Sequence, residues 1–349
     1  MAGAAEVFPG AIMKKLLVTG GAGFIGSCFV RMLLSEHRDV FVVDIDKLTY
    51  AGNLENLGEY LKHPHHKFIR GDICDGALVE KIIDEHKIEA IINFAAESHV
   101  DRSILSPKIF IETNISGTLT LLEAARDHNL KRFVQVSTDE VYGSLGPEGK
   151  FTEDTRLCPS SPYSASKAAA DHLVKAFGHT WGLKYNITRC SNNYGPYQFP
   201  EKMIPLMINN ALNDKELPVY GDGLYVRDWL YVYDHCTAVW KVLTESAPGE
   251  IYNIGGCNEK TNLEVVGMIL QRLGKPESLI KHVTDRPGHD RRYATDSTKI
   301  IKQLNWQPTV SFEEGLEKTI DWYLQNSRWL ANIVSGEYQK YYDAVYKNR

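Results

Sequence analysis

The sequence has little of what marks a membrane, nucleic-acid-binding or disulfide-bonded protein. No apolar run approaches the roughly 20 residues that a bilayer-spanning helix needs. No basic block stands out, and the formal net charge of −5 argues against a nucleic-acid surface. The six cysteines are scattered without Cys-x-x-Cys or metal-like spacing, which predicts reduced thiols, no bound metal and a cytoplasmic location. What remains is an ordinary globular composition, 43% apolar and 24% charged.

The first twelve residues are small and mildly apolar but lack a basic start, so they make a poor signal peptide. Met13 stands immediately before Lys14, Lys15 and Leu16. We therefore expect residues 1–12 to be an extension or an expression remnant outside the fold, and the first domain to begin at residue 13.

A glycine-rich turn follows the first predicted strand, residues 15–19, and precedes an apolar helix expected at 24–35. Gly20, Gly23 and Gly26 let the backbone turn tightly, approach a pyrophosphate and pack the helix against the sheet. The N-terminal amides and the dipole of that helix would face the phosphates. Although glycine-rich turns are common, the strand before this one and the helix after it favour a dinucleotide site.

A second predicted strand, 40–46, ends in an acid and indicates which dinucleotide binds. Asp46 lies 20 positions beyond Gly26 (46 − 26), where a carboxylate would bind the adenosine ribose and disfavour a 2′-phosphate. Asp44 is the competing candidate, and we prefer Asp46 because it ends the strand. The pattern predicts NAD rather than NADP.

Strands and helices then alternate, which is typical of an α/β protein with a doubly wound parallel Rossmann sheet. Further strands are expected at 67–73, 90–96, 132–136 and 185–189, with helices at 77–86, 109–129 and 163–181 and a polar loop at 97–102. These elements predict an NAD-binding domain over residues 13–190.

The alternation breaks at a long loop, 190–202, rich in turn formers, amides and aromatics, and such loops are usually functional. The shorter, mixed elements after it predict a smaller α/β substrate-binding lobe, mainly over 191–349. Strands at 227–232 and 250–255 are expected to return in part to the first domain. The last predicted helix, 312–330, carries Trp322 and Trp329 for packing.

Side chains that can move protons gather after the strand at 132–136. Thr138, Asp139 and Glu140 place a hydroxyl and two carboxylates at a strand's carboxyl end, where open α/β sheets carry their chemistry. Tyr163 and Lys167 are four residues apart and would share one helix face. A turn acid, a solvated charge and a chance Tyr-x-x-x-Lys spacing are the plainer explanations.

In a nicotinamide enzyme these groups would divide the work. A free tyrosine has a pKa of ~10, so the Lys167 ammonium and the cationic nicotinamide would be needed to stabilise a phenolate, which Thr138 could also hydrogen-bond. Oxidation of a sugar at carbon 4 makes the carbon 5 proton acidic. One carboxylate could then remove that proton while a second, protonated carboxyl donates to the hydroxyl leaving carbon 6.

On these motifs the chain resembles the extended short-chain dehydrogenase/reductases, and within them the dTDP-glucose 4,6-dehydratases. The resemblance runs from Met13 to Trp329. Related 4-epimerases usually keep the glycine turn and the Tyr–Lys pair but lack the Asp-Glu after the threonine. The matching stretches are TGGAGFIG at 19–26, DKLTYAGN at 46–53, AAESHVDRS at 95–103, STDEVYG at 137–143, YSASK at 163–167, CSNNYGPY at 190–197, EKMIPLM at 201–207, RDWLYV at 227–232 and RPGHDRRYA at 286–294.

The resemblance implies a lyase of deoxysugar biosynthesis that keeps NAD bound and converts dTDP-glucose to dTDP-4-keto-6-deoxyglucose. It implies Tyr163 as the redox base, Glu140 as the carbon 5 base and Asp139 as the acid. It also implies a homodimer that pairs through helices including 163–181.

Binding residues are implied by position in the same motifs. Cofactor contacts are implied for Gly20, Gly23, Phe24, Ile25, Gly26, Asp46, Lys47, Leu48, Thr49, Asp72, Ile73, Ala95, Ala96, Ser98, Thr113, Tyr163, Lys167 and Asn193. Nucleotide-sugar contacts are implied for Ser98, Thr138, Asn192, Lys202, Met203, Ile204, Pro205, Leu206, Met207, Pro218, Val219, Tyr220, Arg227, Asn262, Asp285, Arg286, Pro287, Gly288 and His289.

Two other functions stay open at this point. A nucleotide-sugar 4-epimerase would need no elimination acids, and a catalytically silent NAD-binding sensor would have no use for Thr138, Tyr163 and Lys167 together. Thymidine and uridine diphosphate, and rhamnose and secondary-metabolite pathways, are also alternatives. Arg189 and Thr295 stand where the family pattern favours variable or apolar residues, and we expect neither to touch the chemistry.

Overall fold

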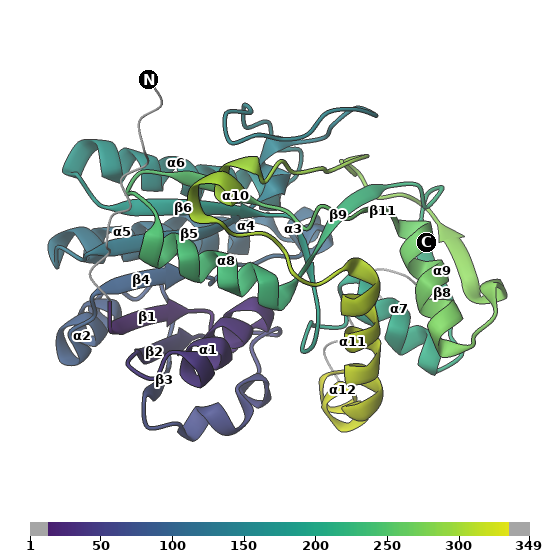
Figure 1. Cartoon of the computed structure of the whole chain (residues 1–349), viewed down its shortest axis with the longest axis horizontal. Coiled ribbons are helices and arrows are strands. Elements are labelled where there is room, and N and C mark those ends of the chain that lie inside the picture. The colour runs from purple at the N-terminus through teal and green to yellow at the C-terminus, as the bar shows by residue number, and fades with distance from the viewer. Residues whose placement is uncertain (1–12, 335–349) are drawn as a thin grey trace.

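The computed structural model describes residues 13–334, so the expectation for residues 1–12 lies outside the described residues. Seven parallel strands form the central sheet in the order β10-β6-β5-β4-β1-β2-β3 (Figure 1). The order reverses between β1 and β4, where doubly wound sheets bind their ligands. The predicted fold class is confirmed. The strands are β1 Lys15–Thr19, β2 Phe41–Asp46, β3 His66–Arg70, β4 Ala90–Asn93, β5 Arg132–Thr138, β6 Tyr185–Cys190 and β10 Ile251–Ile254.

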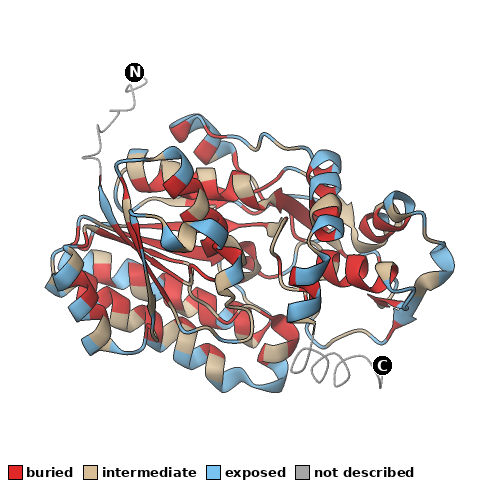
Figure 2. Cartoon of the chain, turned by 90° about the horizontal axis from the view of Figure 1, so that it is seen from below, coloured by how far each residue is buried: buried red, intermediate tan, exposed pale blue. Residues whose placement is uncertain are grey.

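Helices cover both faces of this sheet. Side chains of β1 alternate between two hydrophobic cores, with Leu16 and Val18 in one and Leu17 in the other. The first core contains residues of α1 Phe24–Glu36, α8 Val232–Glu245 and α10 Thr298–Leu304, and the second those of α2 Gly76–His86, α5 Thr118–Asp127 and α6 Pro162–Trp181. Figure 2 shows buried residues along the sheet and the inner helix faces, with exposed residues outside.

A second, smaller lobe packs beside the carboxyl ends of the central strands, on the right of Figure 1. A three-stranded sheet, β11-β9-β7, and a two-stranded sheet, β12-β8, lie against four helices around a separate hydrophobic core. These elements are β7 Asn192–Tyr194, β8 Leu217–Tyr220, β9 Val226–Tyr231, β11 Glu259–Thr261, β12 Ile280–Val283, α7 Met203–Leu212, α9 Asn262–Leu273, α11 Phe312–Gln325 and α12 Ser327–Ile333. Trp329 is buried in this core, as expected.

The two strands expected at 227–232 and 250–255 lie in different sheets. β10 pairs with β6 at one edge of the large sheet, whereas β9 pairs with β7 and β11 in the small one. The expected partial return to the first domain therefore applies to the 250–255 stretch and not to 227–232. The division into two domains at residue 190 stays a prediction.

The helix expected at 109–129 is not α-helical throughout. Pro107–Phe110 (α4) is α-helical, Ile111–Gly117 is π-helical, and α5 follows. The wider turn carries Asn114, whose buried amide bonds the backbone N–H and C=O of Glu97 and the hydroxyl of Ser166. Because π-turns re-aim single side chains, this one lets Asn114 hold the loop after β4. That loop also contains a short helix, α3 Val100–Leu105, where a polar loop was expected.

No helix among residues 13–334 is long and apolar enough to cross a membrane. In the same range, no group of three or more His, Cys, Asp or Glu side chains is placed to hold a metal ion.

Candidate active site

The glycine turn after β1 has the close contacts that exclude side chains. Gly20 has φ +71°, and a Cβ on it would come within 2.8 Å of the Ala95 backbone nitrogen. A Cβ on Gly26 would come within 2.2 Å of the Gly20 carbonyl oxygen. α1 starts directly after Gly23 with no side-chain cap and no acid in its first turn. Its first amides are therefore available to an anion.

Asp46 and Asp44 occupy different environments. Asp46 is half-buried at the end of β2 and lines the cavity beside the glycine turn, accepting hydrogen bonds from Ala22 N at 3.0 Å and Leu48 N at 2.7 Å. Asp44 is fully buried, accepts from Gly21 N at 3.1 Å and lies 3.7 Å from His66. The geometry therefore favours Asp46 as the ribose acid and gives Asp44 a structural role.

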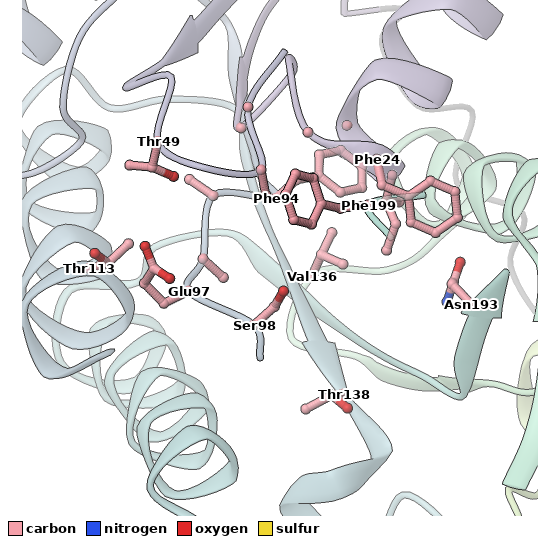
Figure 3. Close-up of a pocket in the computed structure, with 18 of the residues that line it drawn as sticks. Phe24, Thr49, Phe94, Glu97, Ser98, Thr113, Val136, Thr138, Asn193 and Phe199 are labelled. Atoms are coloured by element: carbon pink, nitrogen blue, oxygen red, sulfur yellow. The ribbon is translucent and has the colours of Figure 1, made fainter. Parts of the chain in front are cut away.

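A cavity of about 290 Å³ runs from the glycine turn to the end of β5. Figure 3 shows the rings of Phe24, Phe94 and Phe199 on one side of it, with Glu97 and Thr113 on another. It brings together every residue predicted to contact the cofactor except Leu48, together with Thr138, Asp139 and Glu140. Leu48 has φ +56° and directs its amide to Asp46.

A second cavity of about 150 Å³ adjoins the first on the side of the smaller lobe. Four residues line both cavities: Glu140, Asn192, Glu201 and Lys202. Of the residues predicted to contact the nucleotide sugar, the second cavity gathers Asn192, Lys202, Met203, Leu206, Met207, Pro218, Val219, Tyr220, Arg227, Asn262, Arg286 and His289. Ser98 and Thr138 line the first.

Five predicted contacts line neither cavity: Ile204, Pro205, Asp285, Pro287 and Gly288. Ile204 is buried in the core of the smaller lobe. Asp285 lies behind His289, whose Nδ1 is 2.7 Å from the Asp285 carboxylate, and it also accepts from the Tyr225 hydroxyl. Asp285 therefore supports the cavity wall through His289.

The structure adds residues that were not predicted. In the second cavity they are His99, Val100, Asp101, Glu201, Trp229 and Val266. In the first they are Ile45, Ala51, Gly52, Gly71, Phe94, Glu97, Val136, Ser137, Cys190, Ser191, Gln198, Phe199 and Glu201. Several of these lining residues come directly after the carboxyl end of a strand. That position in the sequence could have identified them as site residues.

The acid pair sits on a single tight turn. β5 extends to Thr138, two residues beyond the expected end, and a 3₁₀ turn then spans Asp139–Tyr142. The Thr138 hydroxyl accepts from Glu140 N at 3.2 Å and lies 3.4 Å from the Asp139 carboxylate. This turn places both carboxyl groups on the wall of the first cavity, which an extended strand would not do.

The two carboxyl groups differ in the charges that surround them. Burial raises the pKa of Asp139 well above its usual range, and the nearby charges of Glu140 and Asp228 raise it further. Burial also raises the pKa of Glu140, but Arg286, Lys202 and Arg227 all act to lower it. Asp139 is therefore held as an acid, whereas Glu140 faces cations that favour its anion.

Tyr163 and Lys167 lie in the first two turns of α6. The helix begins at Pro162 because Ser161 and Ser164 form a reciprocal capping box, with bonds of 3.0 and 3.1 Å. Both side chains are buried and line the first cavity.

The protein alone holds Tyr163 as a neutral phenol. Burial raises the pKa of Tyr163 well above its ordinary value, Glu140 adds to this, and the Thr138 hydroxyl acts to lower it. Lys167 donates to the Val136 carbonyl at 2.7 Å, and burial lowers the pKa of its ammonium. The expected support of the phenolate by Lys167 stays a prediction.

Two arginines and a lysine converge on the second cavity. Arg227 donates to the carbonyls of Val226 and Asp290 and lies 4.3 Å over the Tyr293 ring, and no carboxylate in residues 13–334 forms an ion pair with it. Arg286 lies 3.8 Å from Asp101, and Lys202 donates to the Ser98 carbonyl at 2.6 Å. This is the charge pattern that binds a diphosphate.

The expectation for Thr295 is wrong, since its hydroxyl lies 3.4 Å from the Asp139 carboxylate. Arg189 lines neither cavity. Its guanidinium pairs with buried Asp171 at 2.9 Å and donates to the Tyr142 hydroxyl at 3.0 Å, so it stabilises the packing of α6 on β6.

Comparisons with known proteins agree with this site. A model of the GDP-mannose 4,6 dehydratase family matches residues 17–319. A dTDP-glucose 4,6-dehydratase of Xanthomonas campestris pv. campestris (strain B100) is 55% identical over 345 residues, covering 94% of this chain and 98% of that protein.

Solved structures extend the comparison. A dTDP-glucose 4,6-dehydratase of Bacillus anthracis in complex with NAD has a TM-score of 0.87 at 51% identity, over 92% of this chain and 99% of that one. A UDP-glucose 4-epimerase of Thermotoga maritima has a TM-score of 0.84 at 32% identity, over 90% and 99%. Dehydratases and epimerases thus share the architecture, and sequence identity separates them. The chain belongs to the dTDP-glucose 4,6-dehydratase family of extended short-chain dehydrogenase/reductases.

Proposed function

We propose that the protein is an NAD-dependent hydro-lyase that removes water from dTDP-glucose to give dTDP-4-keto-6-deoxyglucose. The observation that carries the proposal is the presence of Asp139 and Glu140 in the same cavity as Tyr163 and Lys167. A redox step alone uses the tyrosine and lysine, and an elimination alone uses the two acids. Only a reaction that combines both steps uses all four.

The first cavity fits NAD. The glycine turn is packed so tightly that a Cβ at Gly20 or Gly26 would clash with backbone atoms, and the uncapped start of α1 suits a pyrophosphate. Asp46 has a half-buried carboxylate at the distance along the chain where the adenosine ribose binds. Bound there, NAD would supply the hydride acceptor and donor that the oxidation at carbon 4 and the reduction at carbon 6 need.

The protein's own groups move the protons. Tyr163, whose phenolate a bound nicotinamide cation would stabilise, takes the proton of the carbon 4 hydroxyl as that carbon is oxidised. The resulting ketone makes the carbon 5 proton acidic. Glu140, among Arg286, Lys202 and Arg227, is the base that removes this proton. Asp139, kept neutral by burial and by Glu140 and Asp228, gives its proton to the carbon 6 hydroxyl, which leaves as water.

The second cavity would hold the nucleotide diphosphate. Arg227 and Arg286 are the cations for the two phosphates, since guanidinium groups bind such oxygens in pairs. Glu140 and Lys202 line both cavities, so a sugar between the diphosphate and the nicotinamide would pass directly over the acid pair.

We also propose that the protein is a homodimer in the cytoplasm. Leu105 of α3 is 69% exposed and Ile111 is 47% exposed, and both belong to segments packed against α6. Such apolar surface favours a partner. The six free cysteines suit a reducing compartment. A monomer mass in sedimentation equilibrium would contradict the dimer.

The function is tested by incubating the purified protein with dTDP-glucose and, separately, UDP-glucose. We expect the 4-keto-6-deoxy product from dTDP-glucose without added reductant, because the hydride is returned within each turnover. A 4-epimer with its carbon 6 hydroxyl intact would support the epimerase alternative. Binding of nucleotide sugar with no new product would support the sensor.

A further inference from the structure

We infer that Thr295 is a positioning residue for the elimination step, holding the Asp139 carboxyl group from the side opposite Thr138. The inference rests on the proposed function, since it concerns the acid of that reaction. The two threonine hydroxyls lie 3.4 Å from different oxygens of the carboxyl group, Thr138 from Oδ1 and Thr295 from Oδ2. Within residues 13–334, Asp139 has no other side-chain hydrogen-bond partner.

The Thr295 hydroxyl is buried and contacts the Asp139 carboxylate. Thr295 is 2% exposed, and a buried hydroxyl without a partner is costly. Its one side-chain partner among the described residues is Asp139. Both separations are long for O–H···O bonds, and catalytic hydrogen bonds commonly shorten when the substrate is bound.

The backbone fixes where Thr295 stands. The neighbouring Ala294 carbonyl accepts from Phe151 N at 2.8 Å, and Asp296 N donates to the Phe151 carbonyl at 2.9 Å, so Thr295 is held at a parallel bridge. Gly255 packs against its other side, where a Cβ would come within 3.1 Å of the Thr295 Cβ. The hydroxyl is thus pre-aimed at Asp139 by contacts that do not involve the substrate.

This placement has a chemical use. When Asp139 gives its proton to the leaving hydroxyl, a carboxylate forms in a buried site beside two other acids. Hydroxyls on both oxygens can accept from the neutral acid and donate to the carboxylate. They fix its rotation before proton transfer and stabilise its charge afterwards.

Several other groups act on the same carboxyl. Glu140 lies on its own turn, Asp228 and Arg227 on β9, Tyr163 on α6 and Cys190 on β6. A change at Thr295 leaves all of these in place. Loss of a donor to the carboxylate raises the pKa of Asp139, so an activity that needs the protonated acid should persist to higher pH.

The test compares Thr295→Val, which keeps the shape without the hydroxyl, with Thr295→Ser, which keeps the hydroxyl. We expect Thr295→Val to slow product formation by on the order of tenfold, to move the alkaline limb of kcat to higher pH, and to raise the reduced-nicotinamide absorbance during turnover. Thr295→Ser should restore all three. Thr319→Val is the matched control, because that buried hydroxyl bonds the Gly315 carbonyl within α11.

The outcomes separate this inference from the proposed function. An active wild type whose Thr295→Val variant keeps its alkaline limb and absorbance would overturn the inference and leave the function intact. Equal losses in Thr295→Val and Thr295→Ser would also overturn it, in favour of packing. A wild type that makes no keto product overturns both. If Thr295→Val has a lower melting temperature than the wild type, a comparison of Thr295→Ala with Thr295→Ser tests the same point.

Discussion

Replacing Tyr163 by phenylalanine is expected to lower turnover roughly 10²–10⁴-fold, the usual loss for one positioned proton-transfer group. The ring remains to pack edge-on against Phe110, with centroids 6.3 Å apart, so the start of α6 should keep its shape. Only the phenolic oxygen is removed. Nucleotide-sugar binding and bound NAD should therefore be unchanged, and no reduced-nicotinamide signal should appear on adding dTDP-glucose.

Tyr252→Phe is the matched control for this variant. Tyr252 is also a buried tyrosine, on β10, with its hydroxyl bonded to Gln303 at 2.9 Å and no place in either cavity. It should retain wild-type turnover. A Tyr163→Phe enzyme within a factor of about two of wild type, far above the loss expected for a general base, would assign the redox base to another residue.

Replacing Glu140 by glutamine is expected to separate the redox step from the elimination. The amide keeps the size of the side chain but cannot take the carbon 5 proton, while Tyr163 and Lys167 remain in place. Adding dTDP-glucose should therefore produce a lasting reduced-nicotinamide absorbance, with keto-deoxy product formed roughly 10²–10⁴-fold more slowly.

Binding gives a second readout for the same variant. Because Glu140 faces Arg227, Arg286 and Lys202, removing its charge should leave those cations free for a diphosphate, and affinity for dTDP-glucose should not fall. Glu153→Gln, a half-buried acid outside both cavities that bonds Asn253 N at 2.9 Å, should behave as wild type. Unchanged dehydration by Glu140→Gln would remove Glu140 from the role of base.

The predicted site features that the structure brings together in the first cavity are encoded within short segments. The glycine turn, the acid closing β2 and the Thr-Asp-Glu run each depend on a strand, a turn and the next few residues, so pattern and spacing suffice. The capping pair Ser161 and Ser164 starts α6 one residue before Tyr163. The parallel order of the sheet follows from the regular alternation of strands and helices.

The residues and features that the sequence did not predict depend on contacts between segments far apart in the chain. Asp101 and Trp229 meet in the second cavity from different lobes, and Thr295 reaches Asp139 across 156 positions. No local pattern distinguishes a buried threonine that packs from one that bonds a carboxylate. The π-turn at Ile111–Gly117 has the same apolar spacing as an ordinary helix, and β9 found its partners in the small sheet only through tertiary packing.

Transfer of deuterium from carbon 4 tests the combined oxidation and elimination most directly. dTDP-glucose labelled with deuterium at carbon 4 is converted in ordinary water, and the product is read by NMR and mass spectrometry. If hydride is taken and returned within one closed site, the label should appear at carbon 6 of the product. Carbon 5, whose proton passes through Glu140, should carry solvent hydrogen. Label retained at carbon 4 with the carbon 6 hydroxyl in place, or label released in free reduced cofactor, would contradict the account.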